Sequence, residues 1–353
     1  MYNILLVLCG GTICSAVNET DDGTYRSISD DAISLLTDNY YHSDSPFKEN
    51  VEFIASENFR ILSENMTVDK WNELIQYFQK ESSFFNKYDG IIVAHGTDTL
   101  AYSSALFSLL LRNIGIPVIF VSSNEPLTSP KANGNENFRK AVECICLGIT
   151  PNVYAVYKNP SSGRMLLHLA SRLTQCKNYS EDFYSEGGID ISDLTDNDYS
   201  LLFNDIKVSN SATLSLDKCP DLHNCVLKID PYVGLDYQAF DYSRFRAVLH
   251  GTYHSGTACA EKTKDSPNYS TQSILHLLDI CPPNVNIFLS PAKNTGEVYD
   301  SVGIISNHSQ KKVHFLYGCT NEMTYVKLLL AYALDVSDVD AFVHTEFNGE
   351  NQA

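Results

Sequence analysis

Short apolar runs that stop abruptly at polar turns, with helix-forming segments between them, restrict the fold of this chain more than any other feature. Three such runs, each with the turn that follows it, are Ile4–Leu8 before Cys9–Thr12, Ile91–Val93 before His95–Thr99, and 115–121 before Ser122-Ser123. A repeated order of strand, helix and strand predicts parallel pairing with helices on the faces of the sheet. Ligands of such sheets bind outside the carboxyl ends of the strands. The sequence therefore predicts an α/β fold in which these three turns lie at one edge.

The segments between the runs predict helices and one loop. Residues 66–80 predict an amphipathic helix with Thr67 at its N-cap, because apolar side chains recur there at helical spacing: Trp71, Leu74, Ile75 and Phe78. An apolar helix is expected over Leu100–Leu111, and a last one over 324–334. The polar residues 14–28, which contain an Asp-Asp-Gly sequence, are expected to form a loop after the first strand.

At 353 residues the chain is long enough for two α/β domains. Residues 1–204 are expected to form the larger, N-terminal catalytic domain, with a mostly parallel sheet flanked by helices. The polar, irregular residues 205–222 are expected to be a linker. Residues 223–353 are expected to form a smaller C-terminal α/β domain with a parallel sheet, because strand-like runs that end in turns recur in 225–234, 245–256 and 284–296.

The charge and cysteine content exclude several classes of partner. A net charge of −18 repels nucleic acid and anionic membranes. The apolar runs are too short to span a bilayer, and no signal-peptide pattern follows Met1, so a cytoplasmic location is expected. The ten cysteines are scattered and lack zinc or redox spacing, which indicates reduced structural thiols. His250 and His254 have no further ligand near them in the sequence, so neither a metal nor another cofactor is expected.

The turn Gly10-Gly11-Thr12 leaves three interpretations open: a plain turn, a phosphate-binding loop, or a site that exposes a hydroxyl group. The phosphate loop is disfavoured because neither a third glycine nor a Gly-Lys-Ser/Thr sequence follows. A second threonine, Thr97, precedes Asp98 at another strand end. Threonine hydroxyls become nucleophiles when a base or lysine activates them. Two such threonines at neighbouring strand ends therefore favour acyl transfer, while His95 is expected to be a hydrogen-bonded structural residue.

Two of these turns together resemble the motifs of the bacterial-type L-asparaginase family. The sequences are GGTI at Gly10–Ile13 and HGTDT at His95–Thr99. Residues 61–67 (ILSENMT) resemble the family's substrate-binding segment, and residues 251–259 (GTYHSGTAC) resemble its second-domain loop. The resemblance spans nearly the whole chain and implies a cytoplasmic hydrolase that converts L-asparagine to L-aspartate and ammonia.

The resemblance also implies the roles of individual residues. Thr12 would attack the side-chain amide carbon, Tyr25 would activate Thr12 from a mobile lid, and Thr97 would lie near the water that hydrolyses the ester. Asp98 and Glu64 would bind the substrate ammonium, and Ser63 with the Gly11 amide would bind its carboxylate. Thr257 would reach the ligand from a neighbouring subunit, which implies a homodimer or homotetramer. The catalytic set is thus Thr12, Tyr25, Thr97 and Asp98, and the substrate-binding set is Gly11, Ser63, Glu64, Thr97, Asp98 and Thr257.

This chain departs from the family pattern at one position, the lysine that the family normally pairs with the second threonine. Matching residues 181–185 (EDFYS) to the segment that follows this lysine places Thr174 at its position. Lys177 and Arg172 are the nearest cations, and an arginine would not replace a lysine neutrally, since its charge is planar and always present.

Two alternatives to an asparaginase remain open at this point. The chain can be a related amidase that acts on glutamine or on an amide within a larger molecule. Because the lysine is missing, it can also be an impaired family member that binds an amino acid or a partner.

Overall fold

The computed structural model describes residues 1–20, 23–29, 31–192, 214–261, 269–293, 299–308 and 313–351, without the side chains of 17–20, 23–26, 57 and 58. The chain divides into two compact units, residues 1–219 with 347–349, and residues 220–346 with 350–353. Residues 205–213 of the expected linker lie outside the described part. Residues 214–219 belong to the first unit, where Gln79 Nε2 donates to the carbonyl oxygens of Leu216 and Cys219, and residues 220–222 belong to the second unit.

A seven-stranded, mostly parallel sheet forms the centre of the first unit, as the apolar runs predict. Its strands, in spatial order, are β11 (Ile189–Asp190), β8 (Met165–Leu169), β7 (Val153–Lys158), β6 (Val118–Val121), β5 (Gly90–Ala94), β1 (Tyr2–Gly10) and β4 (Val51–Ile61). The five strands from β7 to β4 pair in parallel, and β8 pairs antiparallel with both β7 and β11. The central strands β1, β5 and β6 are buried along most or all of their length, which is typical of a sheet covered on both faces.

The order of the strands places a topological switch point beside β1. The chain leaves β1 to form β4 on one side of it, and then crosses to form β5 on the other side. The succession β4-β1-β5-β6-β7 has the doubly wound order in which ligands bind outside the carboxyl ends of the strands where the winding reverses. The turns after β1 and β5 are therefore the places where this topology favours a binding site.

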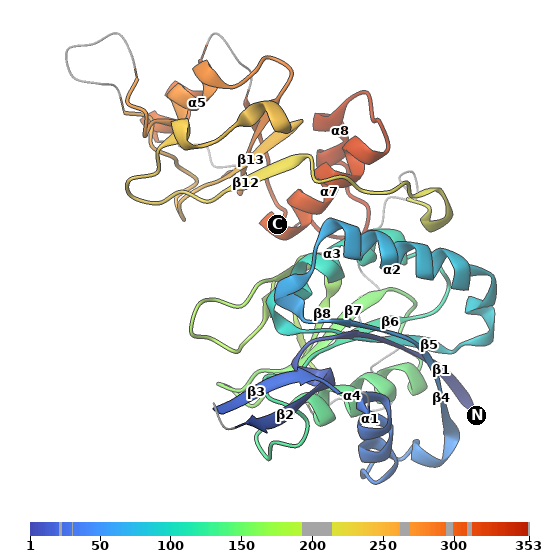
Figure 1. The fold of residues 1–353 in the computed structure, drawn as a ribbon. Coiled ribbons are helices and arrows are strands. Elements are labelled where there is room, and N and C mark those ends of the chain that lie inside the picture. Colours follow the sequence, from blue (N-terminus) through green and yellow to red (C-terminus); the bar gives the residue numbers. More distant parts are fainter. Residues whose placement is uncertain are drawn as a thin grey trace. The chain divides into compact units, whose positions relative to one another are not determined.

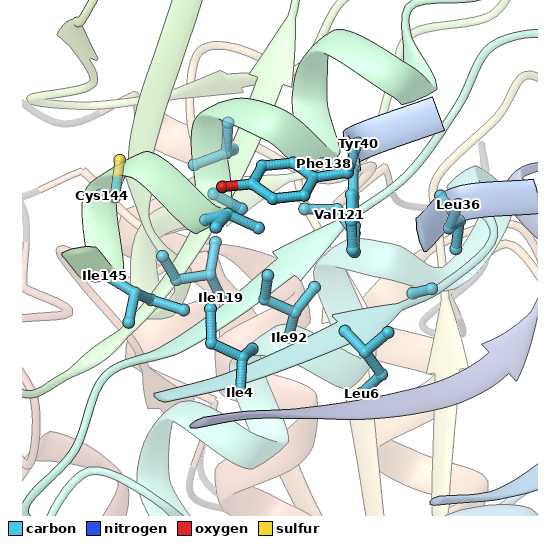
Figure 2. Packing of buried hydrophobic residues seen from close by; sticks show 14 of the residues in the cluster. Ile4, Leu6, Leu36, Tyr40, Ile92, Ile119, Val121, Phe138, Cys144 and Ile145 are labelled. Atoms are coloured by element: carbon cyan, nitrogen blue, oxygen red, sulfur yellow. The ribbon is translucent and has the colours of Figure 1, made fainter. Parts of the chain in front are cut away.

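Helices cover both faces of the sheet, with α2 and α3 on one face and α1 and α4 on the other (Figure 1). These helices are α1 (Ala32–Tyr41), α2 (Val68–Glu81), α3 (Leu100–Leu110) and α4 (Gly134–Cys146). On the α4 side, Phe138 and Ile145 lie over Ile4, Ile92 and Ile119 of three neighbouring strands (Figure 2). On the other face, Phe107 of α3 stacks on Phe120 of β6 at 6.3 Å between ring centroids.

The two helices expected in this unit are confirmed. Helix α2 begins where predicted, because the Thr67 hydroxyl accepts a hydrogen bond from the amide of Lys70 at 3.3 Å. Its four apolar residues at helical spacing are all buried. Helix α3 is buried on nearly every side, which explains why its sequence is apolar throughout rather than amphipathic.

The loop expected over residues 14–28 is wrong. Strands β2 (Ser15–Thr20) and β3 (Gly23–Ile28) form an antiparallel hairpin there. A hairpin of this kind is held by backbone hydrogen bonds between its strands, so polar side chains do not prevent it. Strand β4 and the short hairpin of β9 (Leu173–Thr174) and β10 (Tyr184–Ser185) were not expected from the sequence either.

The second unit contains a four-stranded parallel sheet, as its three strand-like runs predict. Its strands pair in the order in which they follow along the chain, β12 (Val226–Ile229), β13 (Ala247–Gly251), β14 (Asn286–Ser290) and β15 (Val313–Phe315). Its helices are α5 (Ile274–Ile280), α6 (Asp300–Ser306), α7 (Asn321–Ala333) and α8 (Val339–His344). Helix α7 agrees with the last helix expected from the sequence. Within the described ranges, no helix is long and apolar enough to cross a bilayer.

A buried ion pair holds the C-terminal residues of the second unit. Lys327 Nζ of α7 lies 2.5 Å from Glu350 Oε1, and both side chains are fully buried. The same ammonium donates to the carbonyl oxygens of Val343 and Thr345 at 3.1 and 2.8 Å. Because a buried charge is tolerated only when it is paired and hydrogen-bonded, these contacts explain how a lysine and a glutamate remain in this interior.

Candidate active site

The turns after β1 and β5 approach each other so closely that both require glycine. A Cβ atom on Gly11 would lie 2.1 Å from the Gly96 Cα atom. Gly11 also adopts φ 79° and ψ −170°, a conformation that other residues rarely adopt. Thr12 and Thr97 each follow one of these glycines, so the two hydroxyl-bearing residues start from adjoining backbones at the switch point.

The turn after β4 joins the same place through Ser63. A Cβ atom on Gly96 would lie 2.3 Å from the Ser63 Oγ atom. The Ser63 hydroxyl donates to Asp98 Oδ2 at 3.1 Å and accepts from the Asp98 amide at 3.3 Å. The Thr99 hydroxyl donates to the Ser63 carbonyl oxygen at 2.9 Å. Three strand ends that are far apart in the sequence therefore form one hydrogen-bonded cluster, which we call the strand-end cluster (Gly11, Thr12, Ser63, Gly96–Thr99).

The two threonine hydroxyls of the strand-end cluster are available for chemistry. Thr12 begins the 3-10 turn η1 (Thr12–Cys14), and Thr97 begins the 3-10 turn η5 (Thr97–Thr99). Both residues are partly exposed. Within the described part of the chain, neither hydroxyl has a hydrogen-bond partner, whereas the Ser15 hydroxyl beside them donates to the Gly11 carbonyl oxygen at 2.8 Å. As far as the described residues go, the cluster thus combines two hydroxyl groups without a hydrogen-bond partner and one hydrogen-bonded carboxylate, Asp98.

Comparison with known proteins identifies the family of this chain. Residues 3–198 match the family described as "Asparaginase, N-terminal", which is more than half of the chain. The chain belongs to the asparaginase family. Membership places it among the amidohydrolases at the level of reaction class.

Individual relatives of this asparaginase-family chain carry two different names. A glutamyl-tRNA(Gln) amidotransferase subunit from Thermoplasma volcanium is 25% identical over 251 residues, which cover 71% of this chain and 59% of that protein. An L-asparaginase from Thermococcus kodakarensis is 33% identical over 154 residues, 43% of each chain. The match thus spans about three-fifths of the length of the first relative.

Solved structures of L-asparaginases share the fold along the whole chain. The thermostable L-asparaginase from Thermococcus kodakarensis superposes with a TM-score of 0.73 at 21% identity and covers 99% of both chains. L-asparaginase I from Vibrio cholerae superposes with a TM-score of 0.67 at 17% identity and covers 100% of this chain and 99% of its own. At these identities the likeness establishes the fold.

The place of the family's lysine differs from the one that the sequence indicates. Thr174 does not reach the strand-end cluster, because its hydroxyl donates to the Tyr184 carbonyl oxygen across the β9–β10 hairpin at 3.0 Å. The next residue, Gln175, does reach it: its Nε2 donates to the Asp98 carbonyl oxygen, and its Oε1 accepts from the Ala101 amide at 3.0 Å. The residue of this segment that contacts Asp98 is therefore Gln175 rather than Thr174.

The two cations considered as substitutes for the lysine lie in different surroundings. Arg172 Nε donates to the Gly349 carbonyl oxygen at 2.5 Å, so its guanidinium is engaged with the C-terminal segment of the same unit. Lys177 is exposed and borders a cavity of about 350 Å³ whose lining includes Thr97, Asp98, Gln175 and Glu181. Among the described residues, no lysine or arginine is hydrogen-bonded to or ion-paired with Thr97 or Asp98.

The family resemblance implies three further site residues, Glu64, Tyr25 and Thr257. Glu64 follows Ser63 in the 3-10 turn η3 (Ser63–Asn65), and its side chain is exposed. Tyr25 lies in β3, paired with Asn18, and its side chain is outside the described part of the structure. Thr257 belongs to the second unit, where its hydroxyl lies 2.9 Å from that of Ser255. The roles of these three residues remain predictions.

The contact of Gln175 with the cluster was not expected from the sequence, and neither was that of Thr99 with Ser63. The sequence match on residues 181–185 points to Thr174, the residue before Gln175. Only the β9–β10 pairing, which directs Thr174 toward Tyr184, shows which neighbour faces Asp98. In the sequence, Gln175 directly follows Thr174, but its side chain carries no charge and therefore does not match the lysine that the family resemblance implies.

The cysteines near the cluster are structural rather than reactive. All ten are free thiols, which confirms the expectation of reduced cysteines. Burial raises the pKa of the Cys14 thiol to about 12, so it remains protonated and poorly nucleophilic at neutral pH. Within the described residues, no group of three or more histidine, cysteine, aspartate or glutamate side chains is arranged to hold a metal ion.

His95 is a buried structural residue, as the sequence indicates. Its Nδ1 atom lies 2.8 Å from the Gly96 carbonyl oxygen, and its ring packs against Phe120. Burial lowers its pKa to about 4, and the Gly96 hydrogen bond and the Asp98 charge oppose this shift. A histidine that is neutral and enclosed in this way fixes the turn before Thr97 and is poorly placed to exchange protons with solvent.

The buried histidines predict a loss of stability at mildly acidic pH. Burial lowers the pKa of His168 to about 4, as for His95, so between pH 6.5 and 4 the unfolded chain binds these protons more strongly. The free energy of unfolding should therefore fall as the pH drops through this window, by up to about 1.4 kcal/mol per pH unit for each such histidine. Above pH 6.5 their effect is constant.

Urea denaturation at pH 7.5, 6 and 5 measures this dependence. His168 lies outside the strand-end cluster. His168→Gln should therefore reduce the change of the free energy of unfolding with pH by the contribution of one histidine. His42→Gln, at an exposed histidine of the same unit, is the matched control. An unchanged slope in His168→Gln would contradict the prediction.

Proposed function

We propose that this chain hydrolyses the side-chain amide of L-asparagine to L-aspartate and ammonia, with Thr12 as the nucleophile. The observation that carries the proposal is the strand-end cluster, in which Thr12, Thr97 and the Ser63–Asp98 pair meet at the switch point of the sheet. A nucleophile, a second hydroxyl and a carboxylate at one sheet edge are the groups that acyl transfer to water requires.

The proposed reaction has two steps. Thr12 Oγ attacks the amide carbon, its proton passes to the departing nitrogen with the help of Tyr25, and ammonia leaves a β-aspartyl ester on Thr12. A water molecule near Thr97 then attacks the ester, which releases aspartate and returns the proton to Thr12. Backbone amides at the strand ends would stabilise the oxyanion, and removal of one such donor typically costs about a hundredfold or more in rate.

Substrate recognition is proposed to rest on opposite charges. Asp98, together with Glu64, would pair with the substrate ammonium, and Ser63 with the Gly11 amide would bind its carboxylate. We further propose that the protein acts in the cytoplasm as a homodimer or homotetramer, in which Thr257 of a neighbouring subunit contributes to the site. No nucleic acid, membrane or cofactor takes part in this proposal.

A second candidate is an amidase that acts on glutamine or on an amide within a larger molecule. The relatives named as glutamyl-tRNA(Gln) amidotransferase subunits favour it, as does the cavity of about 350 Å³ beside Thr97, which offers room beyond a free amino acid. A third candidate is a protein that binds an amino acid without turnover. The uncharged Gln175 beside Asp98 favours it, since a cation was expected there.

The first experiment incubates the purified protein with L-asparagine and, separately, L-glutamine, and follows ammonia. Ammonia from asparagine at the higher kcat/KM supports the proposal, and a preference for glutamine supports the second candidate. Asp98→Asn should raise KM for asparagine at least about tenfold, because a charge-assisted contact to the ammonium is lost. Binding of aspartate without ammonia from either amide would contradict hydrolysis and favour the third candidate.

A further inference from the structure

We propose that Gln175 is the positioning residue of the reaction, because its side-chain amide clamps the Asp98 carbonyl oxygen and the Ala101 amide at the start of α3. This inference rests on the proposed function and extends it to a residue that was not among the site residues expected from the sequence. An uncharged side chain would then fix the backbone beside Thr97, where the family resemblance implies a cation.

The clamp connects two backbone groups at the start of α3, the Asp98 carbonyl oxygen and the Ala101 amide. The first amides of a helix have no carbonyl within the helix to bind, and Ala101 lies in the first turn of α3. Gln175 Oε1 accepts from this amide at 3.0 Å, while Nε2 donates to the Asp98 carbonyl oxygen three residues earlier. One side chain therefore joins the turn Thr97–Thr99 to the first turn of the helix that follows it.

Asp98 is consequently held from two directions. Ser63 binds its amide and its carboxylate, from the end of β4. Gln175 binds its carbonyl oxygen, from the end of β9. These contacts hold the backbone of Asp98 on both sides, and with it the turn that carries the Asp98 carboxylate and the Thr97 hydroxyl.

Among lysine, glutamate and glutamine, only glutamine can make both contacts of the clamp at neutral pH. An ammonium donates but does not accept, so a lysine at this position would leave the Ala101 amide without its partner. An ionised carboxylate accepts but does not donate, so a glutamate would lose the bond to the Asp98 carbonyl oxygen and place a second negative charge beside Asp98. The position therefore suits a glutamine, and its state does not change with pH.

The first test compares two isosteric substitutions, Gln175→Met and Gln79→Met. Both remove a half-buried amide that bridges backbone groups of the same unit, but Gln79 binds Leu216 and Cys219, outside the strand-end cluster. Gln175→Met should lower kcat by about tenfold to a hundredfold, because small displacements of reacting groups have effects of this size. Gln79→Met should retain the wild-type kcat, although both substitutions should change the thermal midpoint by similar amounts. Equal kinetics in the two variants would overturn the inference.

The second test uses the pH dependence of Gln175→Glu. When protonated, the carboxylic acid can donate to Asp98 and accept from Ala101, as the amide does. The ratio of wild-type kcat to variant kcat should therefore be large at pH 8 and shrink as the pH approaches the ordinary glutamate pKa of about 4.3. A structural role alone predicts a constant ratio, and a constant ratio would overturn the inference.

Failure of the inference can be told apart from failure of the proposed function. A wild-type protein that releases no ammonia from asparagine or glutamine contradicts the proposed function. Gln175 is then judged by aspartate affinity in calorimetry, which Gln175→Met should lower at least about tenfold and Gln79→Met should leave unchanged. Equal affinities, or no aspartate binding by the wild-type protein, would overturn the inference as well.

Discussion

Thr12→Ala should lower kcat for ammonia release from asparagine by about a thousandfold or more, because it removes the atom that forms the covalent ester. Losses of this size or larger accompany removal of a nucleophile from other acyl-transfer enzymes. The thermal midpoint should change little, since Thr12 is partly exposed and its hydroxyl has no partner among the described residues. A stopped assay for ammonia at saturating asparagine measures the effect.

Thr12→Ser is the matched control for this substitution. It keeps a hydroxyl at the same place, so it should retain far more activity than Thr12→Ala. Trapping of a covalent ester by acid quench and mass spectrometry should succeed with the wild-type chain and fail with Thr12→Ala. Turnover that persists unchanged in Thr12→Ala would refute the nucleophile, and an ester found on Thr97 would reassign it.

Gly11→Ala should abolish activity and destabilise the first unit by about 2 kcal/mol or more. Two costs add at this residue. Its φ of 79° with ψ of −170° strains any side chain, and a Cβ atom would lie 2.1 Å from the Gly96 Cα atom. Because that neighbour is backbone rather than a flexible side chain, the turns after β1 and β5 must separate, and Thr12 and Thr97 with them. Urea denaturation and the ammonia assay measure the two effects.

Gly115→Ala and Gly96→Ala separate these two costs. Gly115 has a φ of 84° but nothing within 4 Å of its would-be Cβ, so its substitution carries only a backbone cost of about 1–2 kcal/mol and leaves activity intact. Gly96 has an ordinary φ of −77°, so its substitution carries no cost in backbone conformation, only clashes with the Ser63 side chain and with the Gly11 Cα atom. If Gly11→Ala proves no more damaging than Gly115→Ala, the close approach of the two turns is disproved.

The larger architecture followed from local signals that survive in the folded chain. Apolar runs such as Ile91–Val93 predicted the central strands, because strands covered on both faces must be apolar throughout. The Thr67 cap and the helical spacing after it predicted α2, because both depend on residues three or four apart. The hairpin of β2 and β3 was missed, since backbone bonding between polar strands leaves no hydrophobic period to detect.

The sequence by itself determined which groups were available: a threonine after a glycine pair, a second threonine beside Asp98, and a serine in residues 61–67. Only the tertiary structure decided that they meet, because the approach of Gly11 to Gly96 and of Gly96 to Ser63 depends on the strand order β4-β1-β5. The same holds for Gln175. The sequence shows a glutamine at position 175. Which residue of 173–185 faces Asp98, however, depends on the register of the β9–β10 pairing, and a change of one residue in that register would bring a neighbour there instead.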